Sequence, residues 1–426
     1  MGSKPNNLAY GFIFLMSLLL CGSCFTFGEE EVTISLKKSV FDGQATLSTQ
    51  AQGGALRGSL QQEKNSSSLQ NNLRTNNYFP YDPITGYIEI YEEEGNSMFY
   101  WLSRARENPD TAPVIIWLEG GPGGSSVGTL FSCLGPLEVK DYPKEDKRAR
   151  IRELSWNQKA NVVFPDYPLG TGFSINTEEH VALAAEDIKD QMLRFYQGFL
   201  EKHPEFKGRP IYVAGESYGG HAAPYTAEAL KYSDNPDINV VGLFISSGLI
   251  SGQDMFGSYP EFALLNKNFT KMNQTEYQEF SKLRDVCVYL LKIGPNKLFA
   301  PSAFFTCENF YYIKFLMTTL KKNKNFQMYY MPGDFPVDAT FIQFLNSSGV
   351  KEYLKVRKAE YTFWNQSIFS DTLGPRDFGA DVSPIIGRLL DDGVRAVVVD
   401  GTYDFICNYQ QEEKSITNMN WQGKTG

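Results

Sequence analysis

One stretch near the middle of the chain limits its possible folds more than any other: Gly215-Glu-Ser-Tyr-Gly219. It follows a short β-branched and aromatic run, residues 211–214, that predicts a strand. It precedes a segment from about 222 to 230 that predicts a helix. A G-x-S-x-G between a strand and a helix is the pattern of a nucleophile elbow, a sharp turn that displays its serine. The alternative is an ordinary strand-to-helix turn with a serine near the helix cap.

The two glycines of this pattern have a steric purpose. The backbone of a nucleophile elbow bends so sharply that bulky side chains two positions before and after the serine would clash, and Gly215 and Gly219 carry none. We therefore expect the Ser217 hydroxyl to stand above the carboxyl edge of a parallel sheet. The turn also directs the Tyr218 N–H and the start of the helix at the place where an oxyanion would form.

Apolar runs with the length and β-branching of buried strands recur along the chain and alternate with helical patterns. They cover residues 114–118, 161–164, 211–214, 240–246 and 395–399, after two earlier antiparallel strands at 87–91 and 98–103. The clearest helical pattern, residues 182–200, has Ile188, Met192 and Phe195 on one face. The alternation predicts an α/β fold with a mostly parallel, doubly wound sheet and helices on both faces. From 247 to about 335 it stops, and we interpret this part as an inserted cap subdomain.

The N-terminal part of the chain has the composition of a targeting segment. Lys4 precedes an apolar run at residues 8–20 and then small residues, which is typical of a secretory signal peptide, placed here at 1–28. A membrane anchor is the alternative, but the run is short for a span. Residues 29–76, largely rich in Gln, Ser, Asn and Gly, predict a low-complexity linker or pro-segment. The globular domain then covers 77–426, and we expect no stable membrane span after signal cleavage.

Other features of the sequence agree with secretion. Acceptor sequences for N-glycosylation occur at Asn65, Asn268, Asn273, Asn346 and Asn365. Cys287 and Cys307 both lie in the candidate insertion and form our candidate disulfide pair, although sequence alone leaves the connectivity open. The expected mature chain has no Cys-x-x-Cys pair and the sequence has three histidines, so we expect no metal site and no cofactor. The net charge of −9 argues against nucleic acid as a partner.

Two further segments carry candidate active-site groups. A glycine-rich loop, residues 117–126, directly follows a predicted strand, and its bare N–H groups can approach a substrate oxygen, with Gly121 as the candidate second oxyanion donor. A phosphate-binding loop is the rival interpretation, but the loop has neither a Walker lysine nor G-x-G-x-x-G. Asp400 and Asp404 both lie just past the end of the last predicted strand, where a triad carboxylate belongs. Such residues are often only turn formers.

These motifs together resemble the serine carboxypeptidase family, carboxypeptidase Y-like members of the α/β-hydrolase fold, from about residue 77 to 426. The matching signatures, in order, are Trp117-Leu-x-Gly-Gly-Pro-Gly123, Ser155-Trp-Asn157, Asp166-x-Pro-x-Gly170-Thr-Gly-Phe-Ser174, Gly215-Glu-Ser-Tyr-Gly-Gly-His221 and Gly401-x-x-Asp404-x-x-Cys-Asn408. The resemblance implies acyl transfer through the serine, releasing residues one at a time from the C-termini of peptides or proteins, best at acid pH. It also implies a secreted enzyme or one of a lysosome- or vacuole-like compartment. Oligomeric state stays open.

The resemblance also implies a role for individual residues. Ser217 matches the nucleophile and Asp404, rather than Asp400, the triad acid. The N–H groups of Gly121 and Tyr218 match the oxyanion hole. Four residues match groups that bind or border the substrate: Glu216, Glu119, Gly120 and Cys407.

The sequence departs from the family pattern at the general base. Triad order in this fold is Ser, Asp, His, but His180, His203 and His221 all precede Asp404. We therefore expect either that the sequence is a fragment or that the protein lacks its base and hydrolyses little, because losing a triad member costs about 10⁴–10⁶ in rate. Two alternatives to a peptidase follow: a catalytically inactive binding protein, and an acyltransferase on the same scaffold.

A second departure concerns carboxylate recognition. The family usually has Asn where Glu119 stands, and an amide donates a hydrogen bond to a carboxylate at any pH, whereas a glutamate donates only when protonated. Our hypothesis is that Glu119 and Glu216 form a carboxyl pair that binds a terminal carboxylate while it holds a proton, with like charge raising an apparent pKa of the pair. The alternative is that Glu119 faces solvent.

Overall fold

The structure, a computed structural model, describes residues 78–425 apart from 92–94, 141, 144–146, 178–179, 294–299 and 334–338. The predicted signal peptide at 1–28, the predicted linker or pro-segment at 29–76 and the acceptor Asn65 lie outside the described residues. Among those that are described, no helix combines the length and the hydropathy needed to cross a membrane.

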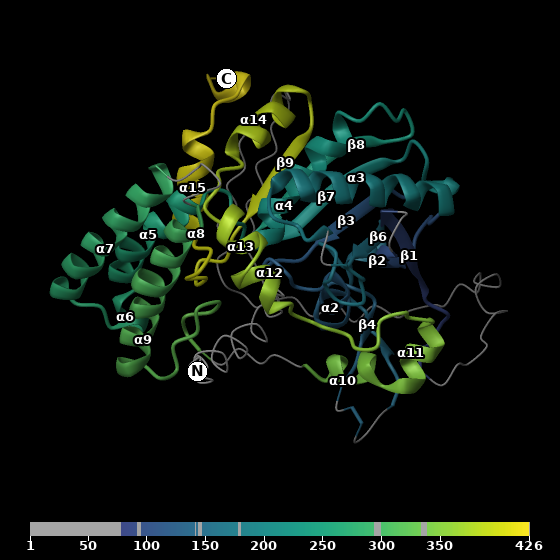
Figure 1. Ribbon diagram of the computed structural model, residues 1–426, viewed down its shortest axis with the longest axis horizontal. Coiled ribbons are helices and arrows are strands. Elements are labelled where there is room, and N and C mark those ends of the chain that lie inside the picture. Colours follow the sequence, from purple (N-terminus) through teal and green to yellow (C-terminus); the bar gives the residue numbers. More distant parts are fainter. Residues whose placement is uncertain are drawn as a thin grey trace, which may run out of the picture.

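A seven-stranded sheet forms the centre of the molecule (Figure 1). Its spatial order is β1 (Ile84–Tyr91), β2 (Asn96–Ser103), β6 (Asn161–Pro165), β3 (Val114–Leu118), β7 (Pro210–Glu216), β8 (Asn239–Ser246) and β9 (Arg395–Val399). The first two strands pair antiparallel, and β2 also pairs antiparallel with β6. From β6 to β9 all neighbours run parallel, which confirms the predicted mostly parallel sheet.

The two faces of the sheet belong to two hydrophobic cores, because side chains alternate along each strand. In β3, Val114 and Ile116 belong to the core shared with α3 (Ala185–Lys202), α4 (Tyr218–Lys231) and α14 (Ser383–Asp391). Trp117 of the same strand belongs to the other core, with α2 (Ser126–Ser132) and α10 (Thr340–Asn346). Helices therefore cover both faces, as the alternating sequence pattern predicts.

The predicted start of the helix after the elbow is wrong by one turn. We expected the helix from about 222, whereas α4 begins at Tyr218, directly after Ser217. The reason is steric: Gly219 and Gly220 make up most of this first turn and sit against Leu118 and Gly248, so the helix can start at the elbow itself. The early start brings the helix N-terminus next to the serine.

The segment between β8 and β9 is helical, and its first helices, α5 to α9, form the side of the molecule at the left of Figure 1. Its first part contains α5 (Gly252–Leu265), α6 (Lys267–Thr270), α7 (Gln274–Ile293), α8 (Ala300–Phe305), the π-helical η6 (Thr306–Tyr312) and α9 (Ile313–Lys322). The later part contains α10, α11 (Ser348–Leu354), α12 (Gln366–Ser370), α13 (Leu373–Asp377) and α14. The chain returns to the sheet at β9.

The remaining elements are short or terminal. They are β4 (Leu137–Glu138) and β5 (Arg150–Ile151), which pair with each other, η3 (Trp156–Gln158), η5 (Pro204–Phe206), α15 (Tyr409–Asn418) and η7 (Gln422–Thr425). Of these, α15 bears on the site, because it follows the Asp404–Asn408 segment and its Asn408 side chain caps it, accepting from Gln411 N.

Candidate active site

Ser217 lies on a strained turn between β7 and α4. Its backbone has φ +56° and ψ −123°, a conformation that costs about 1–3 kcal/mol for a residue with a side chain. Backbone hydrogen bonds to the end of β8 and the segment after it hold it there: Ser217 N donates to Ser246 O at 3.2 Å and to Ser247 O at 3.1 Å, and Leu249 N donates to Ser217 O at 3.0 Å. The turn is therefore fixed by the segment that follows the neighbouring strand β8.

Glycines let the backbone pack this tightly around the serine. A Cβ on Gly215 would overlap the carbonyl oxygen of Gly219, and one on Gly219 would overlap that of Leu118. A Cβ on Gly120 would stand 2.7 Å from Ser217 Cβ. The expectation that the elbow tolerates no side chain at Gly215 or Gly219 agrees with this geometry.

Two amide groups border the serine hydroxyl. Tyr218 N–H is the first of α4, at the positive end of the helix dipole. Gly121 has φ +121°, a backbone that favours glycine, and lines the same pocket as Ser217. Neither N–H donates a hydrogen bond to any residue that the structure describes. Both are thus available to a substrate oxygen.

Asp404 lies behind this pocket and is joined to it through Cys407. Cys407 N donates to Asp404 Oδ1 at 3.1 Å, and the Cys407 side chain, a buried free thiol, lines the pocket with Ser217. Burial raises the pKa of Asp404 to about 7, against the hydrogen bonds from the backbone of Cys407 and Ile406. Burial also raises the pKa of Cys407 well above its ordinary value, so the thiol stays protonated.

Asp400, the other candidate acid, lies close to Asp404, and the Ser247 hydroxyl is a hydrogen-bond partner of both. Ser247 Oγ donates to Asp400 Oδ1 at 3.3 Å, and Asp400 is paired with the buried carboxyl of Glu412 on α15, which accepts from Gly248 N. Burial first, and then the neighbouring acid, raises the pKa of Asp400 well above its ordinary range. This pair supports the loop after β8 rather than the pocket.

Glu119 and Glu216 stand at the ends of adjacent parallel strands. Leu118 of β3 is in register with Gly215 of β7, so the next residue on each strand is one of these two acids, and both are buried. Trp117 Nε1 lies 3.4 Å from Glu119 Oε2. Burial is the largest cause that raises the pKa of Glu119, to about 7, so the rise does not require like charge. With 3% of its surface exposed, Glu119 does not face solvent, which excludes that alternative.

None of the three histidines contacts Ser217 among the described residues. His221 is fully buried, with Nδ1 2.8 Å from Leu249 O and Nε2 3.4 Å from Asp377 Oδ2, so both ring nitrogens are engaged. His203 Nε2 lies 2.8 Å from the Tyr100 hydroxyl. His180 stacks on Tyr91. The general base is therefore not one of these imidazoles.

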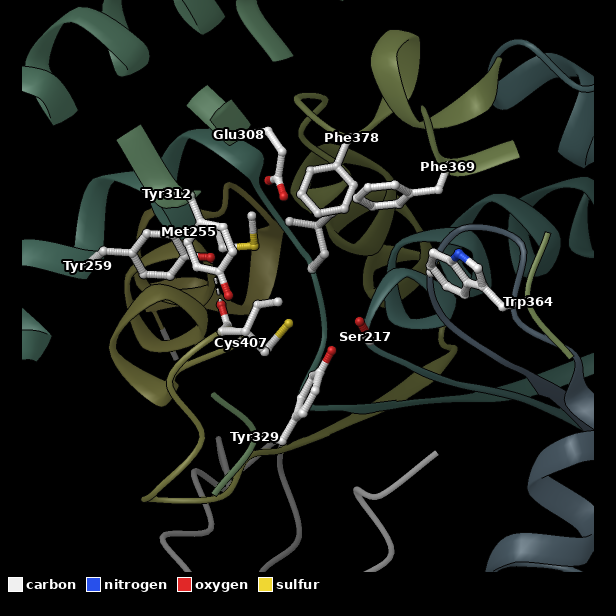
Figure 2. Close-up of a pocket in the computed structure, with 13 residues that line it drawn as sticks. Ser217, Met255, Tyr259, Glu308, Tyr312, Tyr329, Trp364, Phe369, Phe378 and Cys407 are labelled. Carbon is white, nitrogen blue, oxygen red and sulfur yellow. Dashed lines mark hydrogen bonds between the residues drawn. The ribbon is translucent and has the colours of Figure 1, made fainter. Parts of the chain in front are cut away.

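Aromatic and aliphatic side chains form most of the wall of the pocket in front of Ser217 (Figure 2). It encloses about 640 Å³ including the solvent at its mouth. Side chains from the segment between β8 and β9 supply most of its wall, among them Tyr259, Glu308, Tyr312, Trp364 and Phe378. Sequence analysis missed these residues, because they form no motif; the signal was only the abundance of aromatic residues in that segment.

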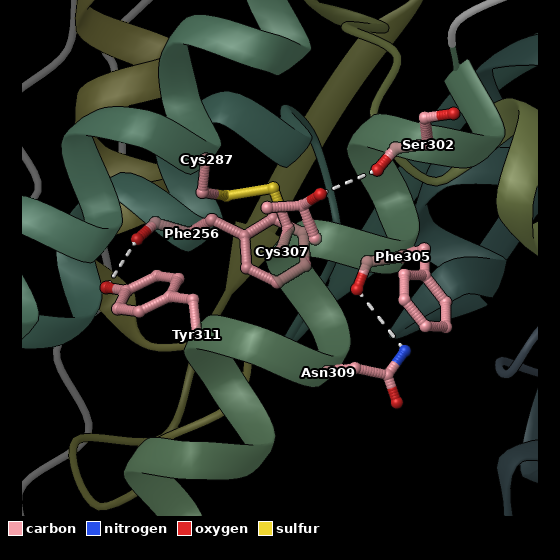
Figure 3. The surroundings of a disulfide bond; sticks show 8 residues. Phe256, Cys287, Ser302, Phe305, Cys307, Asn309 and Tyr311 are labelled. Atoms are coloured by element: carbon pink, nitrogen blue, oxygen red, sulfur yellow. Dashed lines mark hydrogen bonds between the residues drawn. A yellow bond between two sulfur atoms is a disulfide. The ribbon is translucent and has the colours of Figure 1, made fainter.

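The remaining predicted sites lie away from the pocket or contribute to its frame. Cys287 on α7 and Cys307 on η6 are joined by a disulfide with Cα atoms 5.0 Å apart (Figure 3). Asn268 and Asn273 are exposed, whereas Asn346 and Asn365 are half-buried and donate through Nδ2 to backbone carbonyls. In the described part of the chain, no group of three or more His, Cys, Asp or Glu side chains could hold a metal ion.

Comparisons with known proteins give relatives along most of the chain. A family model described as serine carboxypeptidase matches residues 74–426. Serine carboxypeptidase-like 47 of Arabidopsis thaliana is 27% identical over 356 residues, covering 80% of this chain and 67% of that protein. Pheromone-processing carboxypeptidase kex1 of Aspergillus niger is 29% identical over 362 residues, covering 80% of this chain and 57% of that protein. The chain thus spans less than two thirds of the length of some of these relatives.

A solved structure shows the same fold. The chain resembles the crystal structure of Kex1(delta)p, a prohormone-processing carboxypeptidase from Saccharomyces cerevisiae, with a TM-score of 0.66. The two are 24% identical, over 80% of this chain and 77% of that one. The predicted α/β-hydrolase fold is thereby confirmed.

Proposed function

Because this chain belongs to the serine carboxypeptidase family, we propose that it releases single residues from the C-termini of peptides or proteins by acyl transfer through Ser217. The observation that carries the proposal is the position of Ser217: a strained elbow whose hydroxyl lines a pocket together with the unpaired amide of Gly121. The fold alone supports many chemistries, so the geometry of this site has to carry the assignment.

In the proposed reaction the Ser217 oxygen attacks the carbonyl carbon of the last peptide bond. The carbonyl oxygen becomes an oxyanion that accepts hydrogen bonds from the N–H groups of Tyr218 and Gly121. The C–N bond then breaks, the C-terminal amino acid leaves after taking a proton, and water hydrolyses the ester on Ser217. The serine proton must pass to a base oriented by Asp404, and the described residues include no imidazole in that place.

The terminal carboxylate of the substrate is proposed to bind at the ends of β3 and β7. Glu119 and Glu216 lie there beside Gly120, whose lack of a side chain leaves room next to Ser217. Glu119 has a pKa near 7, so at acid pH it holds a proton that it can donate to a carboxylate. This favours activity at acid pH and use in an acidic compartment of the secretory pathway, or after secretion.

A fluorophosphonate probe tests the nucleophile directly. Protein expressed from the complete open reading frame should be labelled at Ser217, and Ser217→Ala should not. The labelled protein should also trim a peptide acid and leave the matching C-terminal amide intact. Labelling without trimming, but with acyl transfer to an alcohol, would favour the acyltransferase. Peptide binding without labelling would favour the inactive binding protein.

A further inference from the structure

Two buried acids lie behind the segment that holds the Ser217 elbow, and neither lines the pocket that the serine faces. Glu412 belongs to α15 and Asp400 follows β9, and we call them the acid pair. Resting on the proposed function, we propose that Glu412, through one proton that it shares with Asp400, is a positioning residue that holds Ser217 in its reactive conformation. The backbone contact of Glu412, the strain of the segment that it contacts and the isolation of the acid pair carry this inference.

Glu412 contacts the backbone directly at the segment after β8. Its Oε1 atom accepts a hydrogen bond from Gly248 N, and the neighbouring Gln411 donates through Nε2 to Gly248 O at 2.8 Å. A side chain does not fit at Gly248, because its Cβ would overlap Ile245 Cγ2 and stand 3.2 Å from Glu412 Oε1. Both backbone polar groups of this glycine are therefore held by the first turn of α15.

The segment that Glu412 holds is strained and is bonded to the elbow. Ser247, just before Gly248, has φ +42°, in the left-handed region that residues with a side chain rarely adopt. Ser217 has φ +56° and donates its N–H to Ser247 O, while Leu249 N donates to Ser217 O. Two unfavourable backbone conformations thus support each other, and such conformations persist only where the surroundings hold them. The contact from α15 is one that holds them from outside.

The acid pair needs one proton to be stable in these surroundings. Asp400 Oδ2 is buried and has no hydrogen-bond donor among the described residues. Two adjacent buried carboxylates repel each other, whereas a proton on Asp400 lets this acid donate to Glu412. Glu412 then keeps the negative charge, which makes it the stronger acceptor for Gly248 N. Burial is the largest cause that raises the pKa of both acids well above their ordinary values.

Few other charges reach the acid pair. From the turn before α15, the Asp404 carboxyl and the Cys407 thiol face it, and Asp404 adds to the rise in the pKa of both acids. From α5, Asp254 contacts the same helix, but its carboxylate binds Lys414 Nζ at 2.8 Å. The segment after β8 contains no titratable group, and α4 meets it through Gly220. Among the described residues, no lysine or arginine forms an ion pair with either acid.

The positioning should therefore depend on pH in a defined direction. Each acid has a higher pKa in the folded state than in the unfolded state, so the contact is complete at acid pH and weakens when rising pH removes the shared proton. Both carboxylates are then charged, and their repulsion disturbs the contact with Gly248. The Ser247 hydroxyl is a partner of both Asp400 and Asp404, so the same step changes the charge beside the proposed triad acid. Ser217 should consequently lose reactivity above neutral pH.

The test compares protein expressed from the complete open reading frame with Glu412→Gln, Glu412→Ala and, as the matched control, Glu413→Gln. Glu413 is the next residue on α15 and is exposed. A glutamine at position 412 still offers an acceptor to Gly248 N and a donor to Asp400, so this variant keeps the contact without a shared proton. An alanine there removes the acceptor at every pH.

Two measurements follow the contact and its effect between about pH 5 and 9. Hydrogen exchange with mass spectrometry, corrected for the intrinsic exchange rate, gives the protection of residues 246–249 and needs no catalysis. The rate of fluorophosphonate labelling gives the reactivity of Ser217. Circular dichroism at each pH shows whether the rest of the protein stays folded.

In the unchanged protein and in Glu413→Gln, protection and labelling should both fall on the alkaline side, by up to about tenfold for each pH unit once the shared proton is lost. Glu412→Gln should remove this fall in both measurements, and Glu412→Ala should have low values at every pH. The same alkaline fall in Glu412→Gln as in the unchanged protein overturns the inference, even where Glu412→Ala does not fold. The expected protection without any labelling would remove the proposed function and keep the contact, whereas labelling that Glu412→Gln leaves unaltered would do the reverse.

Discussion

The Tyr218 hydroxyl donates a 2.5 Å hydrogen bond to Asp377 Oδ2, and both residues are buried beneath the first turn of α4. The other carboxylate oxygen accepts from the Tyr225 hydroxyl at 3.3 Å, and His221 Nε2 lies 3.4 Å from Oδ2. One carboxylate thus holds three polar side chains of α4, the helix whose first N–H borders Ser217. The Asp377 carboxylate thereby fixes the ring of Tyr218, whose N–H is the proposed oxyanion donor.

Asp377→Ala should lower the free energy of unfolding by about 3–5 kcal/mol, because it leaves three buried polar groups without their acceptor. Tyr218→Phe removes one hydrogen bond, and Asp377 keeps its other partners, so about 1–2 kcal/mol is expected. Urea unfolding followed by circular dichroism measures both. Equal losses in the two variants would contradict a shared acceptor.

Gly219→Ala should prevent the elbow from forming, because its Cβ would overlap the carbonyl oxygen of Leu118. We expect no soluble native protein or a loss of more than about 4 kcal/mol. Gly257→Ala in α5 is the matched control: its Cβ meets nothing closer than Val288 Cγ2 at 3.7 Å, and alanine is the better helix former by about 0.5–1 kcal/mol. The melting temperatures of the two variants should therefore move in opposite directions.

The protein should be most stable at acid pH. Burial raises the pKa of Asp166 from 3.8 to about 6, and of Glu119 and Asp404 to about 7. A carboxyl group whose pKa is higher in the folded state than in the unfolded state binds more protons when the protein is folded. The contribution of these groups to the free energy of unfolding is therefore greatest below about pH 4 and decreases as the pH rises toward 7. Each unit of pKa difference is worth about 1.4 kcal/mol, so Asp166 alone accounts for about 3 kcal/mol.

Thermal melts across this pH range check the prediction. The melting temperature should fall between about pH 5 and 8, and Asp166→Asn should have a shallower slope because one titrating group is gone. Asp166 accepts from Ser125 Oγ at 2.5 Å and from Phe173 N at 2.9 Å, so the variant also loses some stability at every pH. A melting temperature that rises through this range would refute the assignment.

Binding of a peptide acid, relative to its C-terminal amide, should weaken as pH rises through the pKa of Glu119, near 7. Below that value Glu119 can donate its proton to the terminal carboxylate; above it, two negative groups face each other. Glu119→Gln donates at every pH, so its preference for the acid should persist at about pH 8, with a gain of about tenfold over the unchanged protein. Equal binding of acid and amide at low pH would count against the role of Glu119.

Glycan occupancy should differ between the acceptor sites. Asn268 and Asn273 are exposed, so we expect both to be glycosylated in a secretory host. Asn346 Nδ2 donates to Tyr361 O at 3.1 Å and Asn365 Nδ2 to Gly170 O at 3.3 Å, and both residues are half-buried. Glycopeptide mass spectrometry should find lower occupancy at these two. Full occupancy at all four would show that attachment precedes folding.

Sequence reasoning located the sheet accurately because buried strands leave a local signal. The runs at 114–118 and 395–399 coincide with β3 and β9, since each strand is short, β-branched and ends at a glycine or polar turn. The elbow could also be predicted from the sequence, because its glycines are required by close contacts with residues a few positions away and with the end of strand β3.

The residues of the pocket wall could not be predicted from the sequence in this way. Glu308 and Phe378 are far apart in the sequence and meet only because α8, η6 and α13 pack together, so neither belongs to a local pattern. Asp377 was missed for the same reason: its partners on α4 lie more than 150 residues away. Glu119 is buried because of the register in which β3 pairs with β7, and the sequence of one strand alone does not reveal how it pairs with another.

The disulfide between Cys287 and Cys307 closes a loop of modest length, yet one of its cysteines is the neighbour of Glu308. The nucleophile and its amides come from the sheet edge, whereas the acid that faces them comes from this clamped helical excursion. The nucleophile and most of the residues that line its pocket therefore come from separate stretches of the chain.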